Sequence, residues 1–483
     1  MRTTLLISGL AAAVAACGGD STTCGTGTTK MGNECIADNG GSNSGSNQGS
    51  NTGNDTTCGA GTHLMGTMCV PDDNTVQSAP TITSMTPTEA GIAGGGLFTI
   101  TGTGFVGSNV TDLHVFFGDP TDTNCEATLG AASATEVSGQ VPGGCSLSPN
   151  VTVTLTTNVG SATTSFHYDM IFAGDGIGGG NLSDGTFTAG GSLYVIDPFA
   201  ALSFNIGTLT DANGDAYSYG GMDFNSTGTL FAATTGVATS DVNGAQLISI
   251  DLSSGMATVV GPITDDADNA YVVFDIKFVG GTLYAWAQYE VDPQTQTAGE
   301  VLLSIDPTTA HATQIGATDT TSPFLLGGLA VDASNNLLVA PSGALPDDTL
   351  GLTGELDTVN TTDGTLTTSA TLDWYNAAPI SAMTTFPGTT PVILAVIDNG
   401  TYGPIGSDGT PWTNQTLATI DPTAMDPNFI TNPLFELPGQ TGFQPHIDAI
   451  AVPPASLVLS RKLPRTGWTK LKAAPGGHPL VRR

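Results

Sequence analysis

Short apolar runs separated by turn-forming residues fill most of this chain. Within the runs, hydrophobic and polar positions alternate with a period of two, as in Val151-Thr152-Val153-Thr154. Such alternation is typical of β-strands, and clusters of Gly, Pro, Asn and Ser between the runs are typical of turns. We therefore expect an all-β protein built from many short strands.

A longer repeat covers residues 170–460. The pattern Leu-x-x-Ile-Asp ends at Asp197, Asp251, Asp306 and Asp421, with a degenerate copy ending at Asn360, and the intervals are 54, 55, 54 and 61 residues. Further apolar runs lie between the copies, and four short strands per period predict a β-propeller. The first copy of the repeat begins part-way through a period, and the last copy ends part-way through one. The two incomplete copies can therefore form one shared blade, which gives five blades in total. Residues 170–180 can begin a sixth.

Residues 79–169 have a different pattern. Ala79-Pro80-Thr81-Ile82 is followed by Gly94-Gly95-Gly96 and then by the run Phe98-Thr99-Ile100-Thr101-Gly102. Strands of this spacing predict a sandwich. The segment resembles the IPT/TIG family, which implies an immunoglobulin-like fold and no catalytic residue.

Cysteines mark the segment before this sandwich. Cys24 and Cys35 stand in one C-x10-C unit, and Cys58 and Cys69 stand in a second. Units this small cannot bury a hydrophobic core and need a covalent cross-link, so we expect one disulfide in each. We expect a third disulfide between Cys125 and Cys145. With the Gly/Ser/Asn-rich spacer between the units, residues 17–78 are expected to form a stalk.

The first residues carry a targeting signal. Met1-Arg2 precedes an apolar run from Leu5 to Val14, and Val14-Ala15-Ala16-Cys17 follows. This layout is that of a secretory signal peptide, residues 1–16. The sequence Val14-Ala15-Ala16-Cys17 resembles a bacterial lipobox, which implies lipidation of Cys17 and a place in the bacterial cell envelope. We expect an outer-membrane lipoprotein that faces the periplasm or the cell surface.

Charge is distributed unevenly. The formal net charge is −33, and Lys277 is the only lysine or arginine between Met31 and Ser460. Such a chain repels nucleic acid and anionic lipid, so the lipid anchor is its expected membrane contact and a protein or glycan its expected ligand. Residues 461–483 hold seven of the ten basic residues and no acid. We expect this basic tail to be disordered, or to result from a misread reading frame.

Two groups of residues could carry chemistry. Asp211, Asn213 and Asp215 resemble the start of a calcium loop, and Asp265, Asp266 and Asp268 form a second acidic cluster; ordinary Asx turns are the alternative for both. Asp223, Asp275, Lys277, His446 and Asp448 lie on the strand type expected to line the propeller channel. These five residues could carry acid–base chemistry, or Lys277 could simply pair with a carboxylate.

No complete catalytic motif occurs in the sequence. The isolated match Gly102-Thr103-Gly104-Phe105-Val106-Gly107 to G-x-G-x-x-G lacks the helix that a dinucleotide site needs. We therefore expect a binding or scaffolding protein with no obligatory cofactor, and we assign no catalytic residue. The alternative is a calcium-assisted hydrolase or lyase that acts on the propeller face.

Overall fold

The described part of the chain is built from β-strands. The computed structural model describes residues 28–31, 34–37, 62–65, 68–71, 79–105, 113–176, 191–237, 245–292, 297–319, 327–341, 354–372, 380–388, 391–397, 415–421, 431–437, 447–459, 461–464, 466–473 and 480. Within these residues there is no α-helix, and the only helical element is a 3-10 turn, η2 (Thr123–Cys125). No helix in this part of the chain has the length and apolarity to cross a membrane. The expected all-β class is confirmed.

Two small hairpins precede the sandwich, in a unit that ends at Thr75. The first pairs β1 (Thr28–Met31) with β2 (Glu34–Ala37), and the second pairs β3 (Thr62–Met65) with β4 (Met68–Pro71). The expected partners Cys24 and Cys58 lie outside the described residues, as does Cys17. The two stalk disulfides and the lipid anchor therefore stay predictions.

Residues 79–169 form a sandwich of two four-stranded sheets. The first sheet has the order β5-β7-β10-β9 and the second β6-β12-β11-β8. Alternate residues face inward, as in β11, where Val151, Val153 and Leu155 are buried. The strands are β5 (Thr81–Thr86), β6 (Glu89–Gly91), β7 (Leu97–Thr103), β8 (His114–Phe117), β9 (Thr128–Ala132), β10 (Glu136–Gln140), β11 (Asn150–Thr157) and β12 (Gly160–Asp169).

Aromatic rings fill the centre of this sandwich. Phe117 meets Phe166 edge to face with ring centroids 4.9 Å apart, and meets Phe98 in the same way at 5.4 Å. Tyr168 is buried with them, and its hydroxyl donates to the carbonyl oxygen of Pro142 at 2.6 Å. A buried phenol needs such an acceptor, so this bond fixes the ring within the core.

Cys125 and Cys145 lie close together in this sandwich, but the structure does not support the predicted disulfide. It holds both buried sulfurs as thiols. The Cys125 sulfur lies 3.6 Å from the Cys145 carbonyl oxygen, and the Cys145 sulfur lies 3.4 Å from the Asn124 carbonyl oxygen. Each thiol therefore lies within reach of a backbone carbonyl oxygen on the opposite segment.

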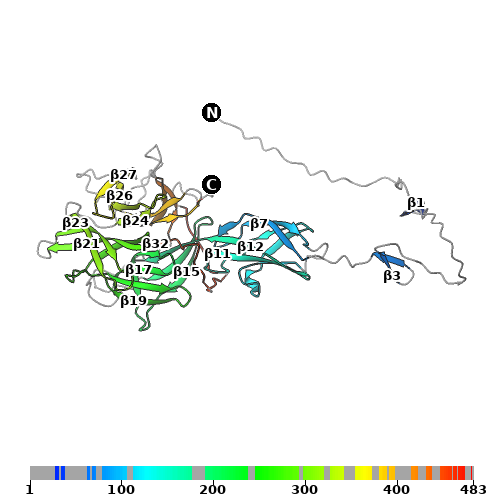
Figure 1. Ribbon diagram of the computed structural model, residues 1–483, viewed down its shortest axis with the longest axis horizontal. Helices are drawn as coiled ribbons and strands as arrows, with labels where there is room; N and C mark the ends of the chain where they lie inside the picture. The colour runs from blue at the N-terminus through cyan, green and yellow to red at the C-terminus, as the bar shows by residue number, and fades with distance from the viewer. Residues whose placement is uncertain are drawn as a thin grey trace, which may run out of the picture. The chain divides into compact units, whose positions relative to one another are not determined.

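Five further sheets form the propeller-like domain (Figure 1), with four antiparallel repeat strands each. The four later sheets follow the chain without interruption. Their strands are β16 (Tyr217–Phe224), β17 (Leu230–Val237), β18 (Gln246–Asp251), β19 (Met256–Pro262), β20 (Val272–Val279), β21 (Thr282–Asp292), β22 (Thr297–Ile305), β23 (Ala312–Asp319), β24 (Gly327–Val331), β25 (Leu337–Pro341), β26 (Gly354–Val359), β27 (Leu366–Leu372), β28 (Ile380–Phe386), β29 (Val392–Ile397), β30 (Thr416–Ile420) and β31 (Thr431–Glu436).

The remaining sheet joins the two ends of the repeat region. Its order begins β32-β13-β14-β15, with β13 (Ile171–Asp175), β14 (Ser192–Asp197), β15 (Leu202–Thr208) and β32 (Ile447–Ala451). Phe172 of β13 pairs with Ala451 of β32, so the late strand completes the early sheet. Residues 171–175 thus belong to this shared sheet and do not begin a sixth one.

The first strands of the sheets lie next to one another. β16 contacts β20, β20 contacts β24, β24 contacts β28, and β32 contacts both β28 and β16. A methyl group at Gly221 of β16 would lie 2.5 Å from Asp275 of β20, and one at Gly328 of β24 would lie 2.7 Å from the Met383 nitrogen of β28. These strands therefore approach so closely that glycine is needed at both positions.

The basic tail is not disordered where the structure describes it. β33 (Thr469–Lys470) pairs with β15, and Leu463 and Leu471 are both 6% exposed. Trp468 packs against Phe204 with ring centroids 5.7 Å apart. Composition alone did not predict this packing, because the few apolar side chains of the segment are buried against a surface that the rest of the chain forms.

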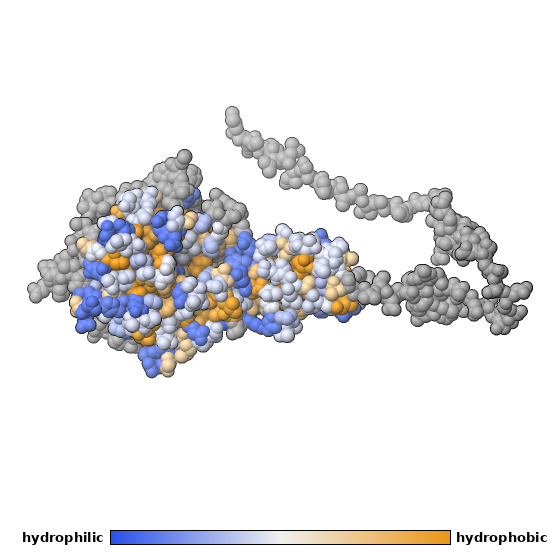
Figure 2. All heavy atoms as spheres, viewed as in Figure 1, coloured by the Kyte–Doolittle hydropathy of each residue, from blue (hydrophilic) through white to orange (hydrophobic). Residues whose placement is uncertain are grey.

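Apolar side chains join the sandwich and the propeller-like domain through one core. A single cluster contains Phe98 of the sandwich together with Phe172, Phe224 and Leu457. On the face that Figure 2 shows, the remaining apolar residues are scattered among polar ones.

Candidate functional site

The first strands place one fully buried carboxylate among three sheets. Asp275 of β20 is 0% exposed. Its Oδ2 accepts hydrogen bonds from the backbone nitrogens of Leu329 on β24, at 2.8 Å, and of Met383 on β28, at 3.2 Å, while Oδ1 accepts from Ile276 at 2.8 Å. Burial raises the pKa of this carboxyl to about 7, although the Lys277 charge and the backbone donors act in the opposite direction. Asp275 thus ties three neighbouring sheets together.

Lys277 and Asp223 form a buried ion pair on neighbouring strands. The Lys277 ammonium lies 3.7 Å from Asp223 Oδ1, which is an ion pair but too long for a hydrogen bond. Lys277 is 3% exposed, and no hydrogen bond to its nitrogen is formed within the described residues. Asp223 Oδ2 accepts from the Phe278 nitrogen at 2.7 Å, and burial raises the pKa of the Asp223 carboxyl despite the nearby ammonium.

Of the five expected channel residues, the structure thus brings three together. Asp223, Asp275 and Lys277 share one cluster, in which the carboxylates accept from backbone nitrogens of neighbouring sheets. Asp448 lies on β32, where its Oδ2 leaves no space for a side chain at Gly176. His446 lies outside the described residues. The cluster is therefore built to hold strands together, and this use of the carboxylates favours a structural role.

A polar group that the sequence analysis missed surrounds Asp175. This residue ends β13, is 3% exposed, and bonds with Ser192 and Tyr194 of β14. Its Oδ1 and the hydroxyl of the fully buried Tyr219 both lack a hydrogen-bond partner within the described residues. Burial raises the pKa of Asp175 to about 7, and burial followed by the Asp175 charge raises the pKa of Tyr219. No motif marks this group, because its members come from three strands.

The first calcium candidate is a hydrogen-bonded turn. Asp211 Oδ1 accepts from the backbone nitrogens of Asn213, at 2.8 Å, and Asp215, at 3.0 Å. Its Oδ2 accepts from the Tyr217 hydroxyl at 3.0 Å. An Asx turn of this kind uses the carboxylate oxygens without a metal ion.

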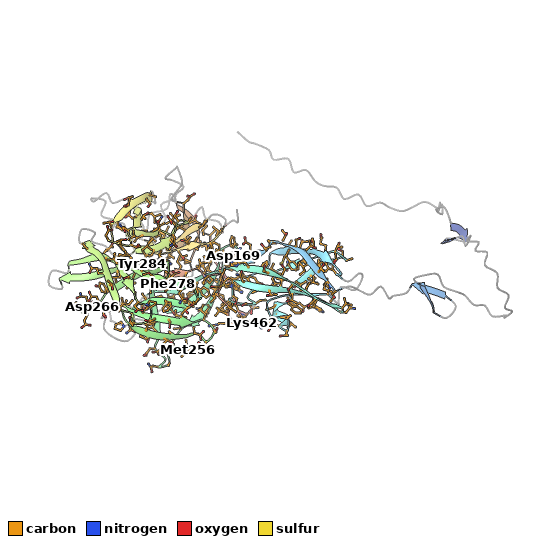
Figure 3. The ribbon with its side chains drawn as sticks, viewed as in Figure 1. Asp169, Met256, Asp266, Phe278, Tyr284 and Lys462 are labelled. Carbon is orange, nitrogen blue, oxygen red and sulfur yellow. The ribbon has the colours of Figure 1, made fainter. Side chains whose placement is uncertain are left out.

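The second candidate repeats this geometry one sheet later. Asp265 accepts from the Asn269 nitrogen at 3.0 Å and from the Tyr271 hydroxyl at 2.9 Å. Burial would raise its pKa, but hydrogen bonds from Asn269 and Tyr271 outweigh burial and hold it at about 2. Asp266 (Figure 3) instead pairs with His311 at 3.0 Å, and Asp268 has a positive φ of 58°. No metal-binding group of three ligands occurs in the described residues, so calcium at either cluster stays a prediction.

The repeated aspartates of the Leu-x-x-Ile-Asp pattern also shape turns. Asp251 accepts from the Ser253 nitrogen and Asp306 from the Thr308 nitrogen, both at 2.8 Å. Asp197 does the same with Phe199 at 3.0 Å, and its Oδ2 also accepts from the Ala93 nitrogen of the sandwich at 2.9 Å. The aspartate recurs along the sequence because it stabilises the turn that follows each of these strands. One of these aspartates, Asp197, also joins the two domains.

Comparison with known proteins identifies the sandwich. Residues 80–168 match the family model of the IPT/TIG domain. This match confirms the resemblance expected for residues 79–169, and we call this part the IPT/TIG domain from here on. No curated protein matches the chain.

Solved structures resemble the chain only distantly. A thermostable family-43 glycoside hydrolase is 8% identical, with a TM-score of 0.35 and coverage of 78% of this chain and 98% of that one. A structural genomics protein of unknown function from Bacteroides thetaiotaomicron is 13% identical, with a TM-score of 0.29 and coverage of 73% and 71%. The GH43 endo-arabinanase from Bacillus licheniformis is 11% identical, with a TM-score of 0.28 and coverage of 47% and 77%. Scores this low carry no argument about function.

Proposed function

We propose that this protein is a lipid-anchored extracellular binding or scaffolding protein, and that its five sheets close into a propeller with one ligand-binding end. The observation that carries the proposal is a difference between the two ends of the propeller-like domain. We call the end where β16, β20, β24, β28 and β32 begin the start end, and the end where they finish the turn end.

The turn end is occupied by the IPT/TIG domain. Asp197, the last residue of β14, lies at this end, and its Oδ2 accepts a hydrogen bond from the Ala93 nitrogen of the IPT/TIG domain at 2.9 Å. The amide nitrogen of Asn150 in the IPT/TIG domain donates to the Ala455 carbonyl at 2.8 Å. These contacts fix the IPT/TIG domain to the turn end.

The start end receives the longest connections of the repeat region. Residues 176–191, 342–353 and 398–415 connect strands there, whereas the turn end is served by short links such as 225–229 and 280–281. The start-end connections carry aspartates but no lysine, arginine or glutamate. Long connections on a rigid scaffold are the usual place for recognition. This arrangement supports a ligand-binding start end.

A loop exchange tests the binding proposal. We would replace residues 398–415 by a short Gly/Ser linker and, as the matched control, replace residues 421–430 at the turn end in the same way. Both proteins and the parent would be applied to a glycan array and to bacterial envelope fractions. We expect the first replacement to abolish binding and the second to preserve it. Equal binding by all three proteins would overturn the ligand-binding start end.

The anchor has its own test. Metabolic labelling with a palmitate analogue should mark the parent protein and leave Cys17→Ser unlabelled, and the variant should leave the outer-membrane fraction. An unlabelled parent that still fractionates with the membrane would contradict lipidation of Cys17.

The second candidate function is a calcium-assisted hydrolase or lyase, and Asp175 favours it. A buried carboxyl with a pKa of about 7 beside a buried phenol can exchange protons near neutral pH. The test is a screen of the full chain, with calcium or chelator, against polysaccharide substrates. Activity that Asp175→Asn removes without loss of folding would select this alternative.

A further inference from the structure

Three consecutive residues of the C-terminal segment occupy a seam between the two domains. Arg461, Lys462 and Leu463 lie against two loops of the IPT/TIG domain on one side and against two sheets of the propeller-like domain on the other. We call this surface the seam. Each of the three side chains meets a different kind of partner there.

The backbone of the segment pairs with the IPT/TIG loop that contains Gly144. The Leu463 nitrogen donates to the Gly144 carbonyl at 2.7 Å, and the Leu147 nitrogen donates to the Arg461 carbonyl at 3.1 Å. Gly144 has a positive φ of 72°, and a methyl group on it would lie 2.7 Å from the Leu463 oxygen. Glycine at this position therefore allows the segment to approach, as in peptide recognition through added backbone pairing.

Arg461 forms hydrogen bonds on the side of the seam that belongs to the propeller-like domain. Its two terminal nitrogens donate to the carbonyl oxygens of Leu252, at 3.2 Å, and of Ile206, at 3.3 Å. Ile206 lies on β15, and Leu252 lies in the turn between β18 and β19 of the next sheet. The planar guanidinium fork suits this pair of acceptors, whereas a single ammonium would not span them equally well.

Lys462 forms ion pairs on the side of the seam that belongs to the IPT/TIG domain. Its ammonium (Figure 3) lies 2.8 Å from Asp122 Oδ2 and 3.3 Å from Asp119 Oδ2. Hydrogen bonds from Thr121 and Lys462 lower the pKa of Asp119 to about 2, and the hydrogen bond from Lys462 contributes most to lowering the pKa of Asp122. Next to Lys462, the Leu463 side chain is 6% exposed and joins the core shared by both domains.

We propose that the seam is a peptide-binding site that recognises the sequence Arg-Lys-Leu, and that the chain's own C-terminal segment is its resident ligand. The segment then acts as a strap that locks the IPT/TIG domain to the propeller-like domain. Charge supports this assignment, because seven of the ten basic residues of the chain lie in the segment that meets an otherwise acidic body.

The experiment weakens the resident segment within the full chain. The triple variant Arg461→Ala, Lys462→Ala, Leu463→Ala removes the three side-chain contacts of the segment, so that an added peptide can displace it, and the control Arg482→Ala, Arg483→Ala removes the same number of charges further along. A fluorescent peptide with the sequence of residues 459–472 is added to each protein. We expect it to bind the triple variant at least about tenfold more tightly than the control or the parent, whose site is already occupied.

Specificity is tested with a second peptide. The same peptide with the three substitutions should bind the triple variant about tenfold more weakly. Equal binding of the two peptides, or equal binding to all three proteins, would overturn the proposal. If the triple variant does not fold, Lys462→Ala in the full chain replaces it. Cleavage by trypsin after Arg461 should then be faster than in the parent and independent of salt, and unchanged, salt-dependent cleavage would contradict the proposal.

Discussion

At the scale of single residues, buried carboxylates decide how the sheets are held. Asp275 and Asp223 accept hydrogen bonds from the backbones of neighbouring sheets, so their cost of burial is offset by charge-assisted bonds. Asp175 has one oxygen without such a bond in the described residues. The same residue type therefore ties strands at one place and leaves hydrogen-bonding capacity at another.

Asp275→Ala should destabilise the protein by about 3 kcal/mol or more, because three buried backbone nitrogens lose their acceptor. Asp275→Asn retains one acceptor oxygen and should cost less. The measurement is urea unfolding of the full chain, and the matched control is Asp266→Ala, whose side chain is 99% exposed. A loss no larger than that of the control would contradict the tie between the sheets.

Asp175 predicts a pH dependence of stability. Its folded-state pKa of about 7 lies above its ordinary value of 3.8, so the folded protein keeps a proton that the unfolded chain loses within this window. Stability should therefore fall as the pH rises from about 4 to about 7, by at most about 1.4 kcal/mol per unit for one group. Asp175→Asn should make this slope shallower in urea unfolding at several pH values, while the contribution of Asp275, whose pKa burial also raises to about 7, remains. Asp266→Asn should leave the slope unchanged. An unchanged slope in Asp175→Asn would show that the folded-state pKa is ordinary.

At the scale of elements, the repeat encodes turns and close strand contacts. The aspartates at the ends of β14, β18 and β22 all accept a hydrogen bond from a nitrogen two residues on. The connections that contain Asp211 and Asp265 each fold around a carboxylate and a tyrosine hydroxyl. These local bonds lie within a few residues, which is why the sequence showed their period.

Asp265→Ala should lower stability by about 1–3 kcal/mol, because it removes the acceptor for several hydrogen bonds of one connection. The thermal midpoint should fall by the same amount in calcium chloride and in chelator if the carboxylate serves the turn alone. A calcium-dependent rise of the parent that the variant lacks would instead establish the metal site.

At the scale of the whole molecule, the joint between the IPT/TIG domain and the propeller-like domain depends on close packing. Gly91 lies so close to Asp197 that an added methyl group would come within 2.1 Å of its Oδ2. The same oxygen accepts from the Ala93 nitrogen at 2.9 Å. A side chain at this point therefore has no room unless the Asp197 carboxylate moves.

Gly91→Ala should displace Asp197 and loosen the joint, at a cost of about 1–3 kcal/mol. Hydrogen exchange at the Ala93 amide should become faster, while Gly96→Ala, which has open space around it, should leave this exchange unchanged. Slow exchange at Ala93 in Gly91→Ala would show that the two domains are not joined through Asp197.

The sequence by itself determined the all-β class, the IPT/TIG segment and the period of the repeat, because alternation and turn chemistry act over a few residues. Only the tertiary structure decided that residues 171–175 share a sheet with residues 447–451, that Asp275 meets three sheets, and that the basic tail is a packed strap. These features depend on contacts between residues far apart in the chain. Composition describes the tail accurately, but it contains no information about the surface that the tail meets.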